Sequence, residues 1–299
     1  MKVYLISPIG KSTPLLFGTF NFERTEDINE ADVVFFDYYS GLGSYNYDEI
    51  NRVAAAKKKV SVFDATDFGA MSKEAWFMNQ EGTHDTLGQS FIRNASHYNN
   101  LIYFMRKMDK TVTYPSWVYP YELLMYDTHK FEPTTKEELY SRYYDFCFIG
   151  NTSPTRSNLI TGLMKYGCFK IDCEFNHTER IPHEEWLNRH RKAKFFISAC
   201  GGGFSDERKF QLTTIAPMLR NKSNHLVLND FIDKEDCIEV KEHPDEYDIQ
   251  KILSVLNDAD KLYNIYIKGI EKMKAYYNAE YRANYILETL KQNGVCSLA

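Results

Sequence analysis

A glycine-rich turn is the strongest chemical signal in the sequence. Three consecutive glycines, Gly201, Gly202 and Gly203, lie between an apolar run at residues 195–199 and a helical pattern that contains Arg208. Glycines let backbone N–H groups approach a ligand closely, and a helix N-terminus adds a positive dipole end. Arg208 could then donate forked hydrogen bonds to a phosphate. The alternative is a plain tight turn in which Arg208 pairs with a neighbouring carboxylate.

A second turn of small residues has the same layout. Gly150, Asn151 and Thr152 follow the strand expected at residues 144–149, and Arg156 comes four residues after Thr152. Backbone amides and hydroxyls in such a turn can bind a diphosphate. Ser153 or Thr152 also fits an N-cap ahead of Pro154 at the first helical position. Capping and ligand contact can coexist, so the turn stays a candidate binding element.

Two aspartates and one histidine are candidates for a general base. Asp64 and Asp67 follow the strand expected at residues 60–63, where a carboxylate could take a proton from an acceptor hydroxyl. His84 is a rival because the usual pKa of histidine lies close to neutral pH. The alternative role for the aspartates is to cap a helix or to hydrogen-bond within a loop.

The remaining candidates lie at the ends of two other strands. Ser7 and Gly10 follow the strand expected at residues 2–6, and Arg106 follows the one expected at residues 101–104. The carboxyl ends of parallel strands meet at one edge of a sheet, so these residues should share a rim with Asp64. Arg106 could bind an acceptor or a phosphate there, or form a surface ion pair.

The elements that position these residues form two successive α/β patterns. Apolar runs separated by helical or irregular segments predict doubly wound domains with parallel sheets. The Pro-, Tyr- and Thr-rich segment 113–138 is the predicted linker, with a boundary near residue 130. Strands are expected at residues 2–6, 33–36, 60–63, 101–104, 144–149, 169–172, 195–199 and 226–228, and helices at 47–59, 157–166, 182–192, 207–219, 247–256 and 263–291, the last with a break near Asn278.

Composition excludes several classes of protein. The chain has 299 residues and a net charge of -5, from 36 Lys and Arg against 41 Asp and Glu, which counts against nonspecific nucleic-acid binding. No apolar run approaches the roughly 20 residues that span a bilayer, and the N-terminus lacks the pattern of a signal peptide, so we expect a cytoplasmic protein. The six cysteines lack paired spacing, so they should be free thiols, and no motif requires a metal.

Both turns, taken with the two-domain plan, resemble the GT-B type nucleotide-sugar glycosyltransferases, and within them the exostosin-like and spore-maturation-protein-like enzymes. The resemblance is carried by residues 146–151 followed by Arg156, and by residues 196–198 followed by glycines and Arg208. It implies two Rossmann-like domains that face each other across a cleft. Residues 1–130 would bind the acceptor, residues 131–277 would bind the donor, and residues 278–299 would form a helix that packs back on the first domain.

This resemblance further implies a transfer of a hexosyl or pentosyl group from a nucleoside-diphosphate sugar, a UDP- or GDP-sugar, to a hydroxyl acceptor such as a glycan, without a metal. Asp64, Asp67 or His84 would be the base, and Ser7, Gly10 and Arg106 would bind the acceptor. Two departures stand out, because Gln211 replaces the usual ribose-binding Glu and residues 220–224 replace a Gly-containing turn. The donor would be bound by Gly150, Asn151, Thr152, Arg156, Ser198, Gly201, Gly202, Gly203, Arg208 and Gln211.

Two alternatives stay open. One is a glycosyltransferase that acts on modified DNA bases, against which the net charge counts because phosphate contacts need clustered Lys and Arg. The other is an inactive nucleotide-binding or interaction module of the same fold, which Gln211 would favour because a neutral amide loses a charge-assisted hydrogen bond.

Overall fold

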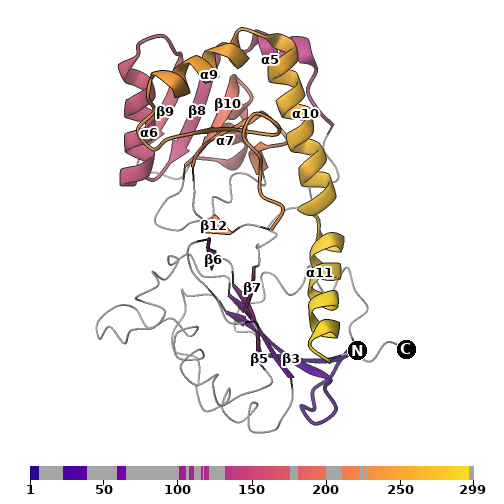
Figure 1. Cartoon of the computed structure of the whole chain (residues 1–299). Helices are drawn as coiled ribbons and strands as arrows, with labels where there is room; N and C mark the ends of the chain where they lie inside the picture. The colour runs from indigo at the N-terminus through magenta and orange to yellow at the C-terminus, as the bar shows by residue number, and fades with distance from the viewer. Residues whose placement is uncertain are drawn as a thin grey trace. The chain divides into compact units, whose positions relative to one another are not determined.

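The chain divides into two compact units, each built on its own parallel sheet (Figure 1). Unit 1 comprises Met1–Met125, Asn224–Leu228 and Ala279–Ala299, and unit 2 comprises Tyr126–Ser223 and Asn229–Asn278. The fold is therefore α/β, as the alternation of apolar runs predicts. The computed structural model describes residues 1–6, 23–38, 59–64, 101–105, 108–110, 116, 118–120, 132–175, 181–199, 211–222, 225–226 and 228–295.

Unit 1 contains a six-stranded sheet in the order β2-β1-β3-β4-β5-β7, with every neighbouring pair parallel. Its strands are β1 (Lys2–Ile6), β2 (Glu23–Arg24), β3 (Val33–Tyr38), β4 (Lys59–Asp64), β5 (Leu101–Met105) and β7 (Val118–Pro120). A separate antiparallel pair joins β6 (Met108–Asp109) to β12 (His225–Leu226). The four strands predicted in this half are confirmed, but β7 lies in the segment predicted as a linker. Pro120 is compatible with β7 because the strand is at the edge of the sheet.

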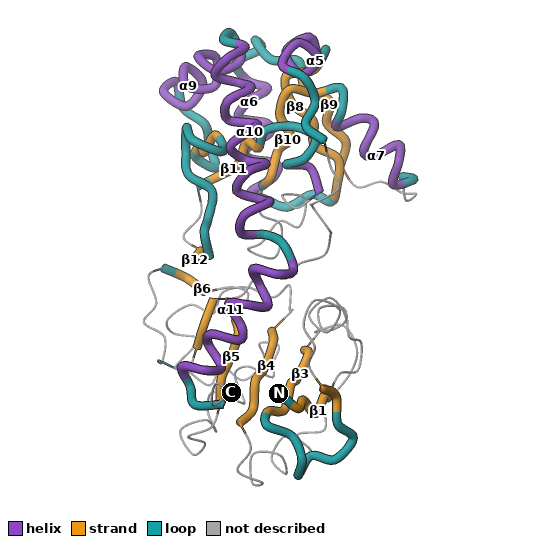
Figure 2. The backbone as a smooth tube through the Cα atoms, turned by 90° about the vertical axis from the view of Figure 1, so that its right-hand side faces the viewer, coloured by secondary structure: helices purple, strands orange, loops and turns teal. Residues whose placement is uncertain are grey.

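Helix α11 (Ala279–Gln292) packs on the sheet of unit 1 and runs alongside β5 (Figure 2). Its buried residues Ala283, Ile286 and Leu290 share one core cluster with residues of β1, β3 and β5. The preceding helix, α10 (Ala259–Tyr276), ends where the sequence predicts a break. The side-chain amide of Asn278 donates to the carbonyl oxygens of Lys274 and Ala275, which satisfies the end of α10.

The sheet of unit 2 has five strands in the order β13-β11-β10-β8-β9, again all parallel. Phe195 and Ile197 of the central strand contribute to one core cluster, and Phe196 contributes to another. Because successive side chains point to opposite faces, this strand is buried on both sides. The strands are β8 (Tyr144–Gly150), β9 (Ile171–Phe175), β10 (Ala193–Ser198), β11 (Met218–Asn221) and β13 (Ile238–Val240), and the helices are α5 (Lys136–Ser141), α6 (Pro154–Lys165), α7 (His183–His190), α9 (Glu246–Leu256) and α10.

Three sequence predictions for unit 2 are wrong in detail. The helix predicted at residues 207–219 ends by Leu212, because a turn and then β11 occupy the following residues. The strand predicted at residues 226–228 is instead β12, which belongs to unit 1. Strand β9 begins two residues later than predicted, and Phe169 packs against the core from outside the strand.

Candidate functional site

The carboxyl edge of the sheet in unit 2 brings together several predicted donor-binding residues. Strand β8 ends at Gly150, and its parallel neighbour β10 ends at Ser198. Asn151 and Thr152, which follow β8, are exposed, whereas Ser198 is only 6% exposed. In α/β folds ligands bind outside the carboxyl ends of the strands, so this edge is the candidate donor site.

The N-terminus of α6 lies at this edge and is capped as predicted. Ser153 is the N-cap residue, and its hydroxyl oxygen accepts a hydrogen bond of 3.3 Å from the backbone N–H of Arg156. Pro154 occupies the first turn, where its missing N–H costs nothing. The hydroxyls of Thr152 and Ser157 share a hydrogen bond of 2.9 Å. The capped helix start therefore presents its positive dipole end beside exposed hydroxyl and amide groups.

Arg156 connects the two loops that leave the sheet at this edge. Its Nε donates to the carbonyl oxygen of Ala199 at 3.1 Å, and its Nη1 donates to the carbonyl oxygen of Asn151 at 2.9 Å. The guanidinium carbon also lies 5.6 Å from the centre of the Phe148 ring, within the range of a cation–π interaction. Ala199 comes two residues before the first of the three glycines. Arg156 thus fixes the point from which the glycine-rich turn starts.

Gln211, the predicted ribose-binding residue, lines a cavity of about 380 Å³ elsewhere in unit 2. The same cavity is lined by Arg142, Arg191 and Ile215, which come shortly before β8, β10 and β11, respectively. Since the amino ends of parallel strands meet at one edge, this cavity lies at the amino edge of the sheet, opposite to the edge at Ser198. We call it the amino-edge cavity.

The other predicted site residues differ in how far the structure describes them. The backbone of Asp64 is the last of β4, where Asp64 pairs with Tyr38 of β3 and Met105 of β5 at the carboxyl edge of the sheet in unit 1. The remaining candidates, Ser7, Gly10, Asp67, His84, Arg106, Gly201, Gly202, Gly203 and Arg208, lie outside the described residues.

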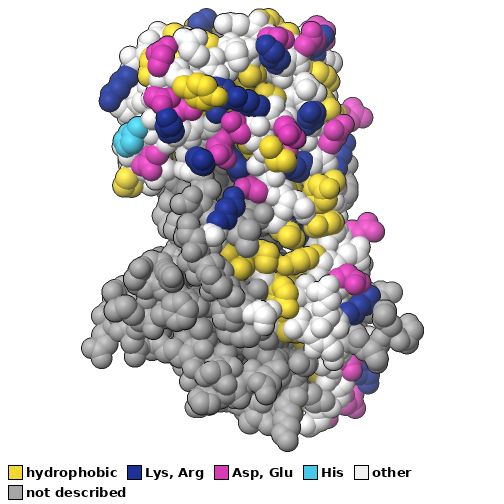
Figure 3. All heavy atoms as spheres, in the orientation of Figure 1, with side chains coloured by type: hydrophobic (Ala, Val, Ile, Leu, Met, Phe, Trp, Pro, Cys, Tyr) yellow, Lys and Arg dark blue, Asp and Glu magenta, His cyan; other side chains and the backbone are white. Residues whose placement is uncertain are grey.

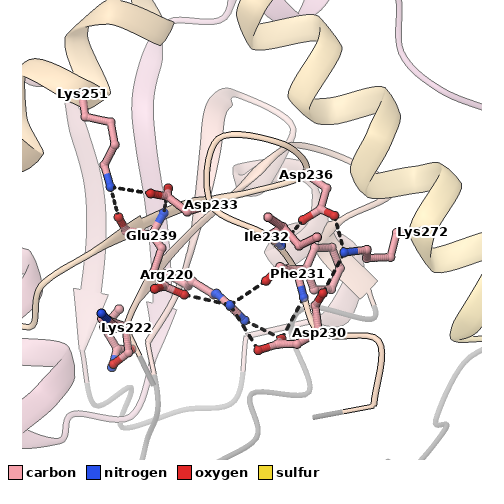
Figure 4. Close-up of polar contacts among 11 residues, drawn as sticks. Arg220, Lys222, Asp230, Phe231, Ile232, Asp233, Asp236, Glu239, Lys251 and Lys272 are labelled. Carbon is pink, nitrogen blue, oxygen red and sulfur yellow. Dashed lines mark hydrogen bonds and ion pairs between the residues drawn. The ribbon is translucent and has the colours of Figure 1, made fainter. Parts of the chain in front are cut away.

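A network of charged side chains beside the end of β11 was not predicted (Figure 4). Arg220, which pairs with Ser198 in the strand register, donates to both carboxylate oxygens of Asp230 at 2.6 and 3.2 Å and to Glu239 at 2.8 Å. Its Nη2 also donates to the carbonyl oxygen of Phe231 at 2.9 Å.

Burial disfavours the charge of Arg220, but the nearby negative groups outweigh it and raise the pKa of its guanidinium. Arg220 belongs to residues 220–224, which replace the glycine-containing turn of the family that the sequence resembles. That replacement was the only feature of the sequence that pointed to this network. The network holds residues 230–231 against β11, so the charge at Arg220 serves to fix a loop near the candidate donor edge.

The described part of the chain contains neither a candidate metal site nor a candidate membrane-spanning helix. No group of three or more His, Cys, Asp and Glu side chains there could hold a metal ion. Asp258 and Asp260 are separated by one residue, a spacing that also occurs in metal-binding motifs. Asp258 is instead the N-cap of α10 and accepts hydrogen bonds from the backbone N–H groups of Asp260 and Lys261. Within the same residues, no helix is long and apolar enough to cross a membrane.

Comparison with known proteins identifies the fold. No family model matches the chain, and no curated protein matches it by sequence. The structure of HepE from Anabaena in complex with UDP matches 98% of this chain and 100% of its own, with 8% identity and a TM-score of 0.57. An alpha-glucosyltransferase in complex with UDP-glucose and DNA containing an abasic site matches 97% of this chain and 99% of its own, with 10% identity and a TM-score of 0.52.

The structure of TarM matches 86% of this chain, with 12% identity and a TM-score of 0.54. A structure of S. aureus TarM in complex with UDP also matches. This chain spans about half of TarM, 54% of its length. These likenesses show the fold, which is that of the GT-B glycosyltransferases, as the resemblance of the two turns implies.

Proposed function

We propose that this protein is a glycosyltransferase that moves a sugar from a nucleoside-diphosphate sugar to a hydroxyl acceptor. The observation that carries the proposal is the match over the full length of HepE, a GT-B protein solved with UDP. The capped start of α6 beside the end of β10 supports it independently, because such an edge suits a diphosphate. A UDP-sugar is the first donor to test and a GDP-sugar the second. Within the fold, we place the chain with the exostosin-like and spore-maturation-protein-like enzymes.

In this proposal the donor diphosphate lies along the carboxyl edge of unit 2. Gly150, Asn151 and Thr152 contact it from one side, while the three glycines and Arg208 contact it from the other. The negative charge that develops on the leaving diphosphate is stabilised by fixed N–H groups and a guanidinium, without a metal ion. Arg156 acts as a positioning residue, since its Nε and Nη1 donate to the carbonyl oxygens of Ala199 and Asn151, one in each loop.

The acceptor is bound by unit 1 through Ser7, Gly10 and Arg106. If the reaction inverts the anomeric carbon, Asp64, Asp67 or His84 takes the proton of the acceptor hydroxyl. The hydroxyl oxygen then forms a bond to the anomeric carbon as the bond to the diphosphate oxygen breaks, and the nucleoside diphosphate leaves with the electron pair. The position of Asp64 at the carboxyl end of β4 supports this assignment.

Thermal stabilisation by nucleotides tests the proposal. A ligand that binds only the folded state raises the melting temperature, so UDP, GDP, ADP and CMP should be compared on the native chain and on Arg208→Ala. We expect a selective shift with one nucleotide, and its loss in the variant. Mass spectrometry then follows hydrolysis of the matching sugar nucleotide without an acceptor. A shift without hydrolysis or transfer would favour the inactive nucleotide-binding module, and no shift with any nucleotide would contradict both.

A glycosyltransferase that acts on DNA bases is the second candidate. It is favoured by the match to the alpha-glucosyltransferase solved with DNA, which extends over nearly all of both chains. Against it, Lys and Arg side chains on the described surface in Figure 3 are interspersed with Asp and Glu, and the net charge is -5. A DNA-binding surface needs a clustered basic patch. Binding of a labelled duplex that weakens steeply with added salt would decide in favour of DNA.

A further inference from the structure

We propose that the amino-edge cavity of unit 2 is a second ligand site, which binds a small oxyanion, a carboxylate or a phosphate group. The cavity has a volume of about 380 Å³, enough for a small metabolite. One wall is a single face of α7, because His183, Leu187 and Arg191 are spaced by four residues. Arg142 and Thr134 line it from the chain around α5. The cavity lies at the opposite edge of the sheet from the proposed donor site.

Arg142 is a buried cation whose ion-pair partner among the described residues is an exposed carboxylate. Its side chain is 5% exposed, and its Nη1 donates to the carbonyl oxygens of Ala193 at 3.0 Å and Ile215 at 2.8 Å. Its Nε has no hydrogen-bond partner among the described residues. The nearest carboxylate in an ion pair is Glu138, 3.8 Å from Nη2, and that side chain is 64% exposed. Burial disfavours the charged form of Arg142 and lowers the pKa of its guanidinium.

The other polar groups of the cavity favour an anion over a cation. Arg191 brings a second guanidinium, whose side chain is 46% exposed and whose Nη1 donates to Asn188 and lies 3.7 Å from a carboxylate oxygen of Glu184. The hydroxyl oxygen of Thr134 is buried and has no partner within the described part of the chain. Glu132 and Glu138 also line the cavity, but both are exposed, so solvent and salt screen their charges. A bound cation would have to lie beside the poorly screened charge of Arg142, whereas an oxyanion would be attracted to it.

Trp186 provides a direct measurement of binding. Its ring lies 5.7 Å from the ring of His183, which lines the cavity, and the two rings are stacked. Replacing the other two tryptophans, Trp76→Phe and Trp117→Phe, leaves Trp186 as the only fluorescent indole in the chain. Its emission is then titrated with inorganic phosphate and, separately, with acetate, with chloride at equal ionic strength as the reference. The anion that binds with the higher affinity identifies the natural group, a phosphate if it is inorganic phosphate and a carboxylate if it is acetate.

Variants decide where the anion binds. Arg142→Ala removes two buried hydrogen bonds and can fail to fold, so Arg191→Ala and Thr134→Val are used instead. Each of these variants loses a hydrogen bond to the charged anion, so we expect each to bind the anion at least about tenfold more weakly than the parent. Lys192→Ala, which removes an exposed neighbouring charge outside the cavity, should bind like the parent.

Arg208→Ala should also leave the Trp186 signal unchanged, because that residue belongs to the proposed donor site. This control separates the inference from the proposed function, since either can fail alone. A signal lost in Arg208→Ala would overturn the inference. So would an emission change no larger than that with chloride, or equal binding by the Arg191→Ala and Lys192→Ala variants.

Discussion

Replacing Arg156 with alanine should destabilise unit 2 and weaken donor binding together. The substitution removes two hydrogen bonds from a charged donor, each contributing about 1.5 kcal/mol, and a cation–π contact worth about 0.5 kcal/mol. Because the side chain is only half-buried, solvent replaces part of this interaction. We therefore expect a net loss of about 2 kcal/mol, which lowers the melting temperature by about 4–8 °C.

Thermal melts followed by circular dichroism, with and without UDP, measure both effects. Lys165→Ala is the matched control, since it removes an exposed cation from the last turn of the same helix and should change stability by less than about 0.5 kcal/mol. Arg156→Lys keeps the charge, but a lysine cannot reach both carbonyl oxygens in the same geometry. This variant should therefore lose most of the stabilisation that Arg156 contributes. An unchanged melting temperature in Arg156→Ala would refute the positioning role. If the UDP shift nevertheless disappeared, Arg156 would have to contact the donor directly.

Three further predictions follow from packing, burial and charge. Gly162→Ala should cost about 1–3 kcal/mol in urea denaturation, because its Cβ would lie 2.6 Å from Cδ of Pro244, and stability equal to the native chain would contradict this close contact. Burial raises the pKa of the Cys173 thiol to about 11, so the thiol stays protonated at pH 8, and mass spectrometry should find exposed Cys168 alkylated well before Cys173. Arg220→Met should destabilise the chain by about 3–5 kcal/mol because it removes the guanidinium that pairs with the half-buried carboxylates of Asp230 and Glu239; a change below about 1 kcal/mol would mean that these carboxylates are solvated.

The elements that sequence predicted best are those with strong local signals. Strands β8 and β10 contain continuous apolar runs, residues 146–149 and 195–197, that fill core clusters on both faces of the sheet, and such runs are typical of buried parallel strands. The N-cap at Ser153 was predictable because a hydroxyl followed by proline is a local feature. The helix predicted to extend to residue 219 is wrong because apolar residues at helical spacing can also be buried in a turn. Ile215 and Ala216 continue the helical spacing of Leu212, but they are buried in a turn ahead of β11.

Contacts between distant residues were beyond sequence reasoning. Arg156 was predicted as a phosphate ligand, yet its partner Ala199 is 43 residues away, and no local pattern indicates that pairing. Strands β11 and β13 are short, and their register, which places Arg220 opposite Glu239, depends on the whole sheet. The amino-edge cavity was missed for the same reason, since its walls come from three separate parts of the chain.

Strand β10 is held at both ends by guanidinium groups, and this links the two edges of the sheet. Arg142 donates to the carbonyl oxygen of Ala193, the first residue of the strand, and Arg156 donates to that of Ala199, just after its last. Between these points every side chain except that of Lys194 is buried, so the strand has little freedom to shift. The point from which the glycine-rich turn starts is therefore fixed. An anion that compensates Arg142 would strengthen the support of this strand from the edge opposite to the proposed donor site.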